Sequence, residues 1–277
     1  MAMLCQFTVK NYKSIRDEVT FDMQAAAISE HEDRIIKDYD EELFLPVSAI
    51  YGPNGGGKSN VLEAIYSLAF KVLRPLYAAG ENNDRIFFQK RSFIEPFVFS
   101  KETKNKPTEF EIFFRTDTAE YRYILHVKKD MVIYESLDRV KLDTGRRCAL
   151  FERGEEIILK GAFSKLKISD GLSATLPLLS YLGITYKKNE IVKDVLEWFE
   201  CGIEFLNYGN PVEELRVAPS NSEDVKQLML GMIQEMDLDI VDFRVIEDED
   251  KQIDIYTKHR VEGCEVELNL LEESSGT

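Results

Sequence analysis

The chain has 277 residues, of which 44% are hydrophobic and 31% charged, a composition typical of folded globular proteins rather than disordered ones. Its net charge of −15 repels phosphates, so the overall charge gives no support to general nucleic-acid binding. The four cysteines form no Cys-x-x-Cys pair and the three histidines share no metal-ligand spacing, which excludes a zinc ribbon and a thioredoxin-like site.

Two features of the sequence favour the cytoplasm as the expected location. No apolar run reaches the roughly 18 uncharged residues that a membrane span needs. Residues 1–10 lack the charged, apolar and cleavage regions of a signal peptide. We therefore expect a cytoplasmic protein without membrane partners.

The first 51 residues predict three strands. Residues 4–9 and 19–23 alternate between apolar and polar side chains, which predicts two strands that pair with each other. Residues 28–42 are polar and charged, so we expect a surface loop. The short apolar run 47–51 predicts a buried strand.

A glycine-rich loop at residues 52–59 follows this third strand. Beyond the loop, apolar residues recur at helical spacing from Lys58 to about Val72, which predicts a helix that Pro75 ends.

The rest of the chain changes from short strands to helices and back. Alternating segments from residue 96 to about residue 160 predict an antiparallel meander. Helices are expected over 172–206 and 225–236. The expected strands lie at 97–99, 110–114, 121–127, 132–134, 149–151, 157–159, 240–246, 253–256 and 266–270.

The glycine-rich loop matches the Walker A pattern G-x-x-x-x-G-K-[ST]. Glycines allow backbone N–H groups to surround an anion, and the following helix directs its own N-terminal N–H groups at the same place. The lysine ammonium is expected on the β- and γ-phosphates and the serine hydroxyl on Mg²⁺. The predicted cofactors are therefore ATP and Mg²⁺. The predicted nucleotide-binding residues are Asn54, Gly55, Gly56, Gly57, Lys58, Ser59 and Asn60, with Ser59 as the metal ligand.

The loop ending in Lys58-Ser59-Asn60 resembles that of ABC-type ATPases of the RecF, SMC and DNA-repair group. The segment Asn11-Tyr12-Lys13-Ser14-Ile15 is similar to the motif that opens those proteins. In the group, the basic residue of that motif lies near bound nucleotide. The resemblance therefore implies that Lys13 is a second nucleotide contact.

A finer resemblance covers most of the chain. His31-Glu32-Asp33, the lead-in 49–52, the strand-rich stretch and the final six residues are together similar to bacterial AAA-family ABC-like ATPases. Members are frequently linked to phage defence, alone or beside a nuclease or toxin partner. The implied fold class is α/β: a P-loop NTPase (ABC-ATPase-like) core with an antiparallel β meander and a helical insertion.

The last residues resemble that family's version of the ABC signature motif. Ser274, Ser275 and Gly276 are the matching positions. In the family, the signature of one protomer closes over the γ-phosphate held by the Walker A loop of the other. The resemblance thus implies a nucleotide-dependent, head-to-tail homodimer that regulates an anti-phage or DNA/RNA-directed effector.

Three segments are expected: a lobe at 1–165 with Walker A and the meander, a helical arm at 166–240, and a return to the ATPase core at 241–277.

No Walker B strand is visible, because Val245-Ile246-Glu247-Asp248 has its acids in the wrong order and precedes the signature. The catalytic residues are therefore unknown, and Gln89 is an insecure Q-loop candidate. The chain is expected to be part of a longer ATP hydrolase and, by itself, to turn over ATP negligibly.

Two alternatives remain at the level of sequence. A non-catalytic nucleotide-sensing or partner-binding fragment would also use the Walker A loop. A small-molecule kinase is disfavoured because a long meander follows the first helix. DNA binding stays open, because Lys and Arg cluster locally at 85–91, 128–129, 139–147 and 187–188.

Overall fold

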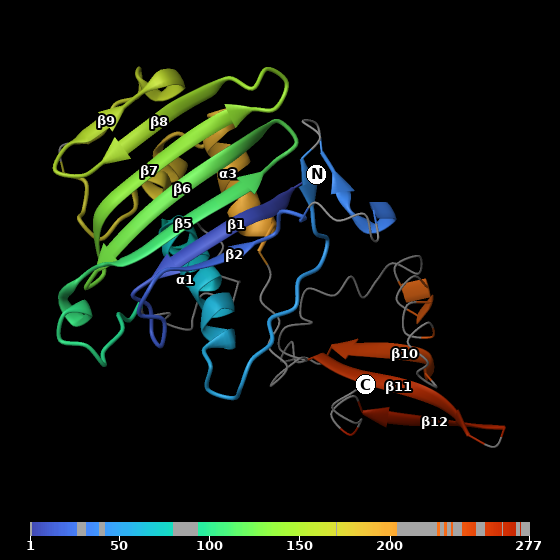
Figure 1. Cartoon of the computed structure of the whole chain (residues 1–277). Coiled ribbons are helices and arrows are strands. Elements are labelled where there is room, and N and C mark those ends of the chain that lie inside the picture. Colours follow the sequence, from blue (N-terminus) through green and yellow to red (C-terminus); the bar gives the residue numbers. More distant parts are fainter. Residues whose placement is uncertain are drawn as a thin grey trace. The chain divides into compact units, whose positions relative to one another are not determined.

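A computed structural model gives the fold in two units, Met1–Glu204 and Phe205–Thr277, each described here by itself (Figure 1). The division differs from the expected segments 1–165, 166–240 and 241–277, because the helices after residue 166 pack within the first unit. The structure describes residues 2–26, 32–38, 42–79, 94–169, 171–203, 226–227, 230–231, 234, 240–247, 253–261, 263–269 and 272.

The first unit is built on a seven-stranded antiparallel sheet with the order β2-β1-β5-β6-β7-β8-β9. The strands β5 to β9 follow one another along the chain, which confirms the predicted meander. The predicted pairing of the first two strands is also confirmed. The strands are β1 (Met3–Lys10), β2 (Val19–Asp22), β5 (Thr108–Arg115), β6 (Ala119–Lys128), β7 (Met131–Lys141), β8 (Arg147–Arg153) and β9 (Ile157–Leu159).

Three helices cover one face of this sheet (Figure 1). They are α1 (Lys58–Ala79), α2 (Leu178–Thr185) and α3 (Glu190–Cys201). Every second side chain along β1 and β6 is buried, and these side chains pack against the apolar faces of the helices. The strands and the helices therefore share one hydrophobic core. The predicted helical stretch 172–206 is thus two helices. Asn189 separates them, and its side chain accepts hydrogen bonds from the N–H groups of Ile191 and Val192.

The prediction that Pro75 ends the first helix is wrong, because α1 continues to Ala79. A proline inside a helix removes one backbone hydrogen bond. Here Val72 and Leu73 are buried before it, and Leu76 and Tyr77 pack against the core after it. Their burial offsets the lost hydrogen bond.

Two carboxylates, the buried Glu135 and the half-buried Asp194, link the helices to the sheet. Glu135 of β7 accepts hydrogen bonds from the N–H groups of Leu178 and Leu179, at 2.6 and 2.9 Å, and thereby caps the start of α2. Asp194 of α3 accepts hydrogen bonds from the hydroxyls of Tyr121, at 2.8 Å, and Thr116, at 2.9 Å. Burial raises the pKa of the Glu135 carboxyl, so this cap carries a desolvation cost.

Two predicted strands do not form. Residues 47–51 and 97–99 lie outside every strand of the described chain. An extended segment becomes a strand only when a neighbour pairs with its backbone. Val47 and Tyr51 are 77% and 90% exposed, which corrects the expectation of a buried strand before the glycine loop.

The predicted surface loop at 28–42 contains part of a small hairpin, β3 (Ile36–Lys37) with β4 (Leu43–Phe44). Arg115 holds this hairpin against the sheet. Its guanidinium pairs with Asp38 at 3.0 Å, Glu42 at 2.5 Å and Glu120 at 2.8 Å, and its side chain is only 3% exposed. Short 3₁₀ helices lie at Glu32–Arg34 (η1), Thr103–Asn105 (η3) and Gly161–Phe163 (η4).

The second unit contains a three-stranded antiparallel sheet of β10 (Ile240–Glu247), β11 (Ile253–Val261) and β12 (Cys264–Asn269). The three strands predicted here are confirmed. Helical residues precede the sheet and agree with the helix predicted over 225–236. The helical residues that the structure describes are Lys226, Gln227, Leu230, Gly231 and Gln234.

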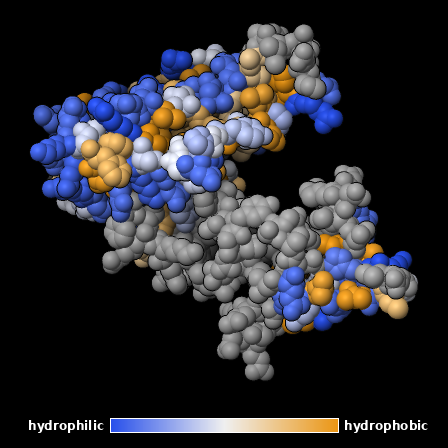
Figure 2. Space-filling view, turned by 60° about the horizontal axis from the view of Figure 1, so that its bottom comes forward, coloured by the Kyte–Doolittle hydropathy of each residue, from blue (hydrophilic) through white to orange (hydrophobic). Residues whose placement is uncertain are grey.

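Hydrophilic residues cover much of the described surface in Figure 2, with apolar residues between them. No helix in the described part of the chain is long and apolar enough to cross a membrane.

All four cysteines are free thiols. Cys5 is buried, and burial raises its pKa to about 12, whereas Cys201 and Cys264 are exposed.

Candidate phosphate-binding site

The glycine loop between Tyr51 and α1 has the backbone geometry of an anion cradle. Gly55 and Gly57 have φ angles of 78° and 83°, in the left-handed region that favours glycine. The N–H of Gly56 donates to the carbonyl of Pro53 at 3.1 Å, which closes a tight turn. Because α1 begins at Lys58, the N–H groups at the start of the helix lie directly after this turn, and the N–H of Asn60 donates to the carbonyl of Gly57 at 3.0 Å.

Lys58 is folded back over its own loop. Its ammonium donates hydrogen bonds to the carbonyl oxygens of Gly52 at 2.8 Å and Pro53 at 2.9 Å. These carbonyls hold the charge beside the loop without neutralising it. An arriving anion would replace these carbonyls as the partner of the ammonium.

The N-terminal turn at residues 11–15 touches the glycine loop. The Asn60 side-chain amide donates to the Ser14 hydroxyl at 2.6 Å. A Cβ atom on Gly57 would lie 2.8 Å from the same hydroxyl, a distance that real Cβ atoms essentially never show. The absence of a side chain at Gly57 therefore lets this turn pack against the loop. Sequence spacing alone did not predict this contact.

Lys13 lies in this turn but is directed to α1. Its ammonium pairs with the Glu63 carboxylate at 2.5 Å and lies 5.6 Å from the ring centre of Tyr12. Burial opposes the charge, but the hydrogen bond to Glu63 and the charge of that carboxylate prevail and raise the pKa of Lys13. The structure thus places Lys13 against the helix that opens the site, and its contact with nucleotide stays a prediction.

Sequence reasoning missed Asn11, which anchors the turn. Asn11 is 3% exposed, and its amide donates to the carbonyls of Thr103, Lys106 and Pro107 at 2.9 to 3.1 Å. Its side-chain oxygen accepts the N–H of Phe97 at 3.0 Å. The φ angle of 55° at Asn11 is a conformation that asparagine tolerates better than most residues. The available signal was an asparagine that directly follows the predicted strand 4–9 and its Lys10, because asparagine is favoured in turns.

The other predicted residues fall into two groups. Asn54 and Ser59 are exposed on the loop, where a ligand has access to them. The proposed signature residues Ser274, Ser275 and Gly276 lie outside the described residues, as does Gln89. The described chain therefore contains the Walker A half of the predicted site.

These residues fit the groups that the motif implies. Positive-φ glycines, a held ammonium and a helix N-terminus are donors suited to a polyphosphate. The exposed hydroxyl of Ser59, one residue after Lys58, suits a hard cation bound beside the phosphates. A glycine loop that opens a helix is the loop–helix part of the strand–loop–helix motif of P-loop proteins, and the strand predicted at 47–51 does not form here.

The comparison with known protein families agrees with a protein of the P-loop class. Residues 47–180 match the family described as "AAA domain, putative AbiEii toxin, Type IV TA system". The match covers just under half of the chain and includes the glycine loop, α1 and the meander. It supports an AAA-type, P-loop ATPase-like protein. No curated protein matches the chain.

Proposed function

We propose that the chain is an ATP-binding, ABC-like ATPase subunit whose glycine loop holds the phosphates of ATP·Mg²⁺. The observation that carries the proposal is the pre-formed loop, in which Gly55 and Gly57 adopt left-handed φ angles and Lys58 already lies beside it. Such preorganisation lowers the cost of binding because little rearrangement remains.

Each residue of the loop has a distinct role in this proposal. The N–H groups of Gly55, Gly57, Lys58 and Ser59 surround the β-phosphate, while the N–H of Gly56 keeps the turn closed on Pro53. Lys58 exchanges its carbonyl partners for phosphate oxygens. Ser59 offers its hydroxyl to Mg²⁺, while Asn60 keeps the loop attached to Ser14. Bound ATP·Mg²⁺ supplies a phosphoanhydride bond whose hydrolysis would release the complex.

The assembly is the second part of the proposal. Ser274, Ser275 and Gly276 of one protomer complete the site of another, in a head-to-tail dimer that regulates an effector with an anti-phage or DNA/RNA-directed action. Support comes from the resemblance of these residues to a signature motif and from the toxin named in the description of the matched family. The effector is a separate protein or a further part of the same polypeptide.

The experiment that tests the site is titration of a fluorescent ATP analogue with Mg²⁺. Lys58→Ala should weaken binding at least tenfold, because it removes a charge-assisted contact. Lys193→Ala is the matched control. Lys193 is also helical and lies on α3, where it pairs with Glu197 at the surface. Equal affinity of Lys58→Ala and the unaltered protein would overturn the proposal.

Light scattering with and without ATP·Mg²⁺ tests the assembly. The mass should double with nucleotide, and both Lys58→Ala and the double variant Ser274→Ala/Ser275→Ala should stay monomeric. A dimer that forms equally without nucleotide contradicts this part of the proposal. Phosphate release measured on the same samples should be negligible, because no Walker B strand is visible in this sequence, and robust steady-state release would contradict that expectation.

A further inference from the structure

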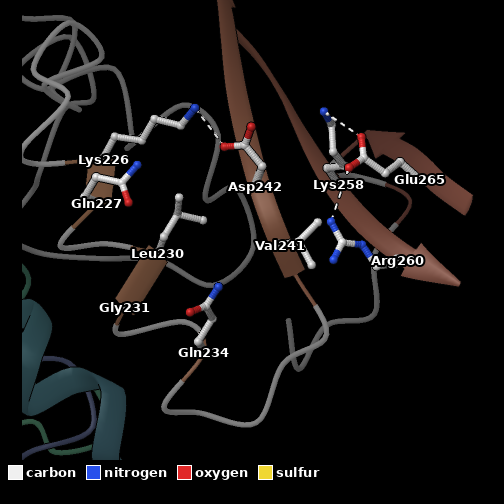
Figure 3. A pocket seen from close by; sticks show the side chains of 10 residues that line it. All are labelled: Lys226, Gln227, Leu230, Gly231, Gln234, Val241, Asp242, Lys258, Arg260 and Glu265. Carbon is white, nitrogen blue, oxygen red and sulfur yellow. Dashed lines mark ion pairs between the residues drawn. The ribbon is translucent and has the colours of Figure 1, made fainter. Parts of the chain in front are cut away.

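The second unit holds a polar pocket of about 590 Å³ that the proposed function does not use (Figure 3). This volume lies within the range of about 300–1,000 Å³ typical of small-molecule sites. Helical residues from Lys226 to Gln234 form one side of the pocket, and residues of β10, β11 and β12 form the other. The pocket is therefore contained within one unit.

The charges of the pocket differ from those of the unit around it. Residues 205–277 contain 18 acidic and six basic side chains. Three of the six basic side chains line the pocket, Lys226, Lys258 and Arg260, and the described acidic side chains that line it are Asp242 and Glu265. Half of the basic side chains of this strongly acidic unit thus line one pocket.

The two carboxylates do not neutralise the three cations. Asp242 pairs with Lys226 at 2.7 Å, while Glu265 is shared between Lys258 at 3.2 Å and Arg260 at 3.5 Å. Figure 3 shows Lys226 on the helical side of the pocket, the Lys258, Arg260 and Glu265 group on the side of β11 and β12, and Asp242 of β10 between them. Among the lining side chains that the structure describes, one positive charge therefore remains in excess, and this excess favours an anion.

A β-bulge shapes the strand that lines the pocket. The register of β10 against β11 shifts between Ile240 and Asp242, so Val241 is the additional residue. Successive residues of a regular strand point to opposite faces, yet both Val241 and Asp242 line the pocket. The bulge places an apolar and a charged side chain next to each other. Leu230, which is nearly buried, extends this apolar part.

From this arrangement we infer that the second unit binds a small organic anion. Its phosphate or carboxylate group lies among Lys226, Lys258 and Arg260, and its carbon skeleton lies against Leu230 and Val241. Arg260 and the two lysines are the side chains that recognise such groups in proteins. The acidic surroundings repel a long polyanion, so the ligand is a compact molecule rather than a nucleic acid.

The test uses NMR of the full chain labelled with ¹⁵N, in the Lys58→Ala background so that the glycine loop does not compete. Inorganic phosphate and acetate are titrated separately at constant ionic strength. Signals of β10 and β11 should shift in a saturable way with at least one probe. A tighter response to phosphate identifies a phosphorylated ligand, and a tighter response to acetate identifies a carboxylate.

Two variants and a matched control locate the site. Lys258→Gln/Arg260→Gln should weaken the response at least tenfold, and Lys226→Gln, which alters only the helical side, should weaken it as well. Arg244→Gln removes a charge from the same sheet outside the pocket, where Arg244 pairs with Glu267, and should leave the response unchanged. Absence of saturable shifts with both probes, or an equal loss in Arg244→Gln, overturns the inference.

Discussion

Two segments meet the glycine loop and differ in how their backbone groups are satisfied. The turn at residues 11–15 has no regular structure, yet Asn11 and Tyr12 are buried and hydrogen-bonded to distant parts of the first unit. The segment at residues 47–51 has the sequence of a strand, yet it is largely exposed and pairs with no described strand. Hydrogen bonding and burial, rather than local propensity, thus decide which segment is firmly held.

Asn11→Ala should have the largest effect on this comparison. It leaves three carbonyls without their donor and places alanine at a positive φ, so the free energy of unfolding should fall by about 3–5 kcal/mol. Urea denaturation measures the loss. Asn11→Gly removes the same hydrogen bonds but tolerates the φ angle, and should be about 1 kcal/mol less damaging. A loss below about 1 kcal/mol in Asn11→Ala would mean that the turn is not held by this side chain.

Gly57→Ala comes next, because it strains the contact between turn and loop. We expect a loss of about 1–3 kcal/mol in the free energy of unfolding, from the positive φ and from the clash with Ser14. Gly55→Ala is the matched control, with a φ of 78° and no atom within 4 Å of the added Cβ. Adding Ser14→Ala should recover part of the loss in Gly57→Ala and none in Gly55→Ala. Identical losses in the two glycine variants would show that Ser14 does not press on the loop.

Lys13→Met should have a smaller effect. The pair with Glu63 is about one-third exposed, so it contributes about 0.2–1 kcal/mol. Because the pKa of Lys13 is raised above its usual 10.5, this contribution is fully present below pH 10.5 and is lost only at higher pH. Thermal unfolding of both proteins at pH 7 and pH 9 should therefore give the same difference. A difference that fell between these values would contradict the pairing.

The smallest effects on stability are expected from substitutions in the segment at residues 47–51. Val47→Ser and Tyr51→Ser should each change the free energy of unfolding by less than about 0.5 kcal/mol, because both side chains already face water. The same denaturation experiment applies. A loss above about 1.5 kcal/mol for either variant would place that side chain in a packed environment and remove the contrast with the turn.

Local patterns were enough to predict most of the first unit. Alternation located β1, β2 and the meander, and helical spacing located α1 and the apolar face of α3, because each signal lies within a few neighbouring residues. The motif also predicted a loop whose glycines take unusual backbone angles. The helix end at Pro75 was wrong because tertiary packing beyond the proline outweighed a local rule.

What sequence could not predict depends on pairs far apart in the chain. Asn11 bonds to residues more than 90 positions away, and Glu135 caps a helix that starts 43 positions later. Arg115 reaches back 77 positions to Asp38. No periodicity encodes such partners. The missing strand at 47–51 has the same cause, because pairing requires a second segment that a single run of residues does not specify.

The cysteines noted above provide a means of following the whole molecule. Cys201 is exposed in the first unit and Cys264 in the second, whereas Cys5 is buried with its pKa raised to about 12 and thus remains an unreactive thiol. Donor and acceptor dyes coupled to the two exposed thiols would report energy transfer between the units. The natural sequence therefore already carries the attachment points needed to ask whether nucleotide changes the separation of its two halves.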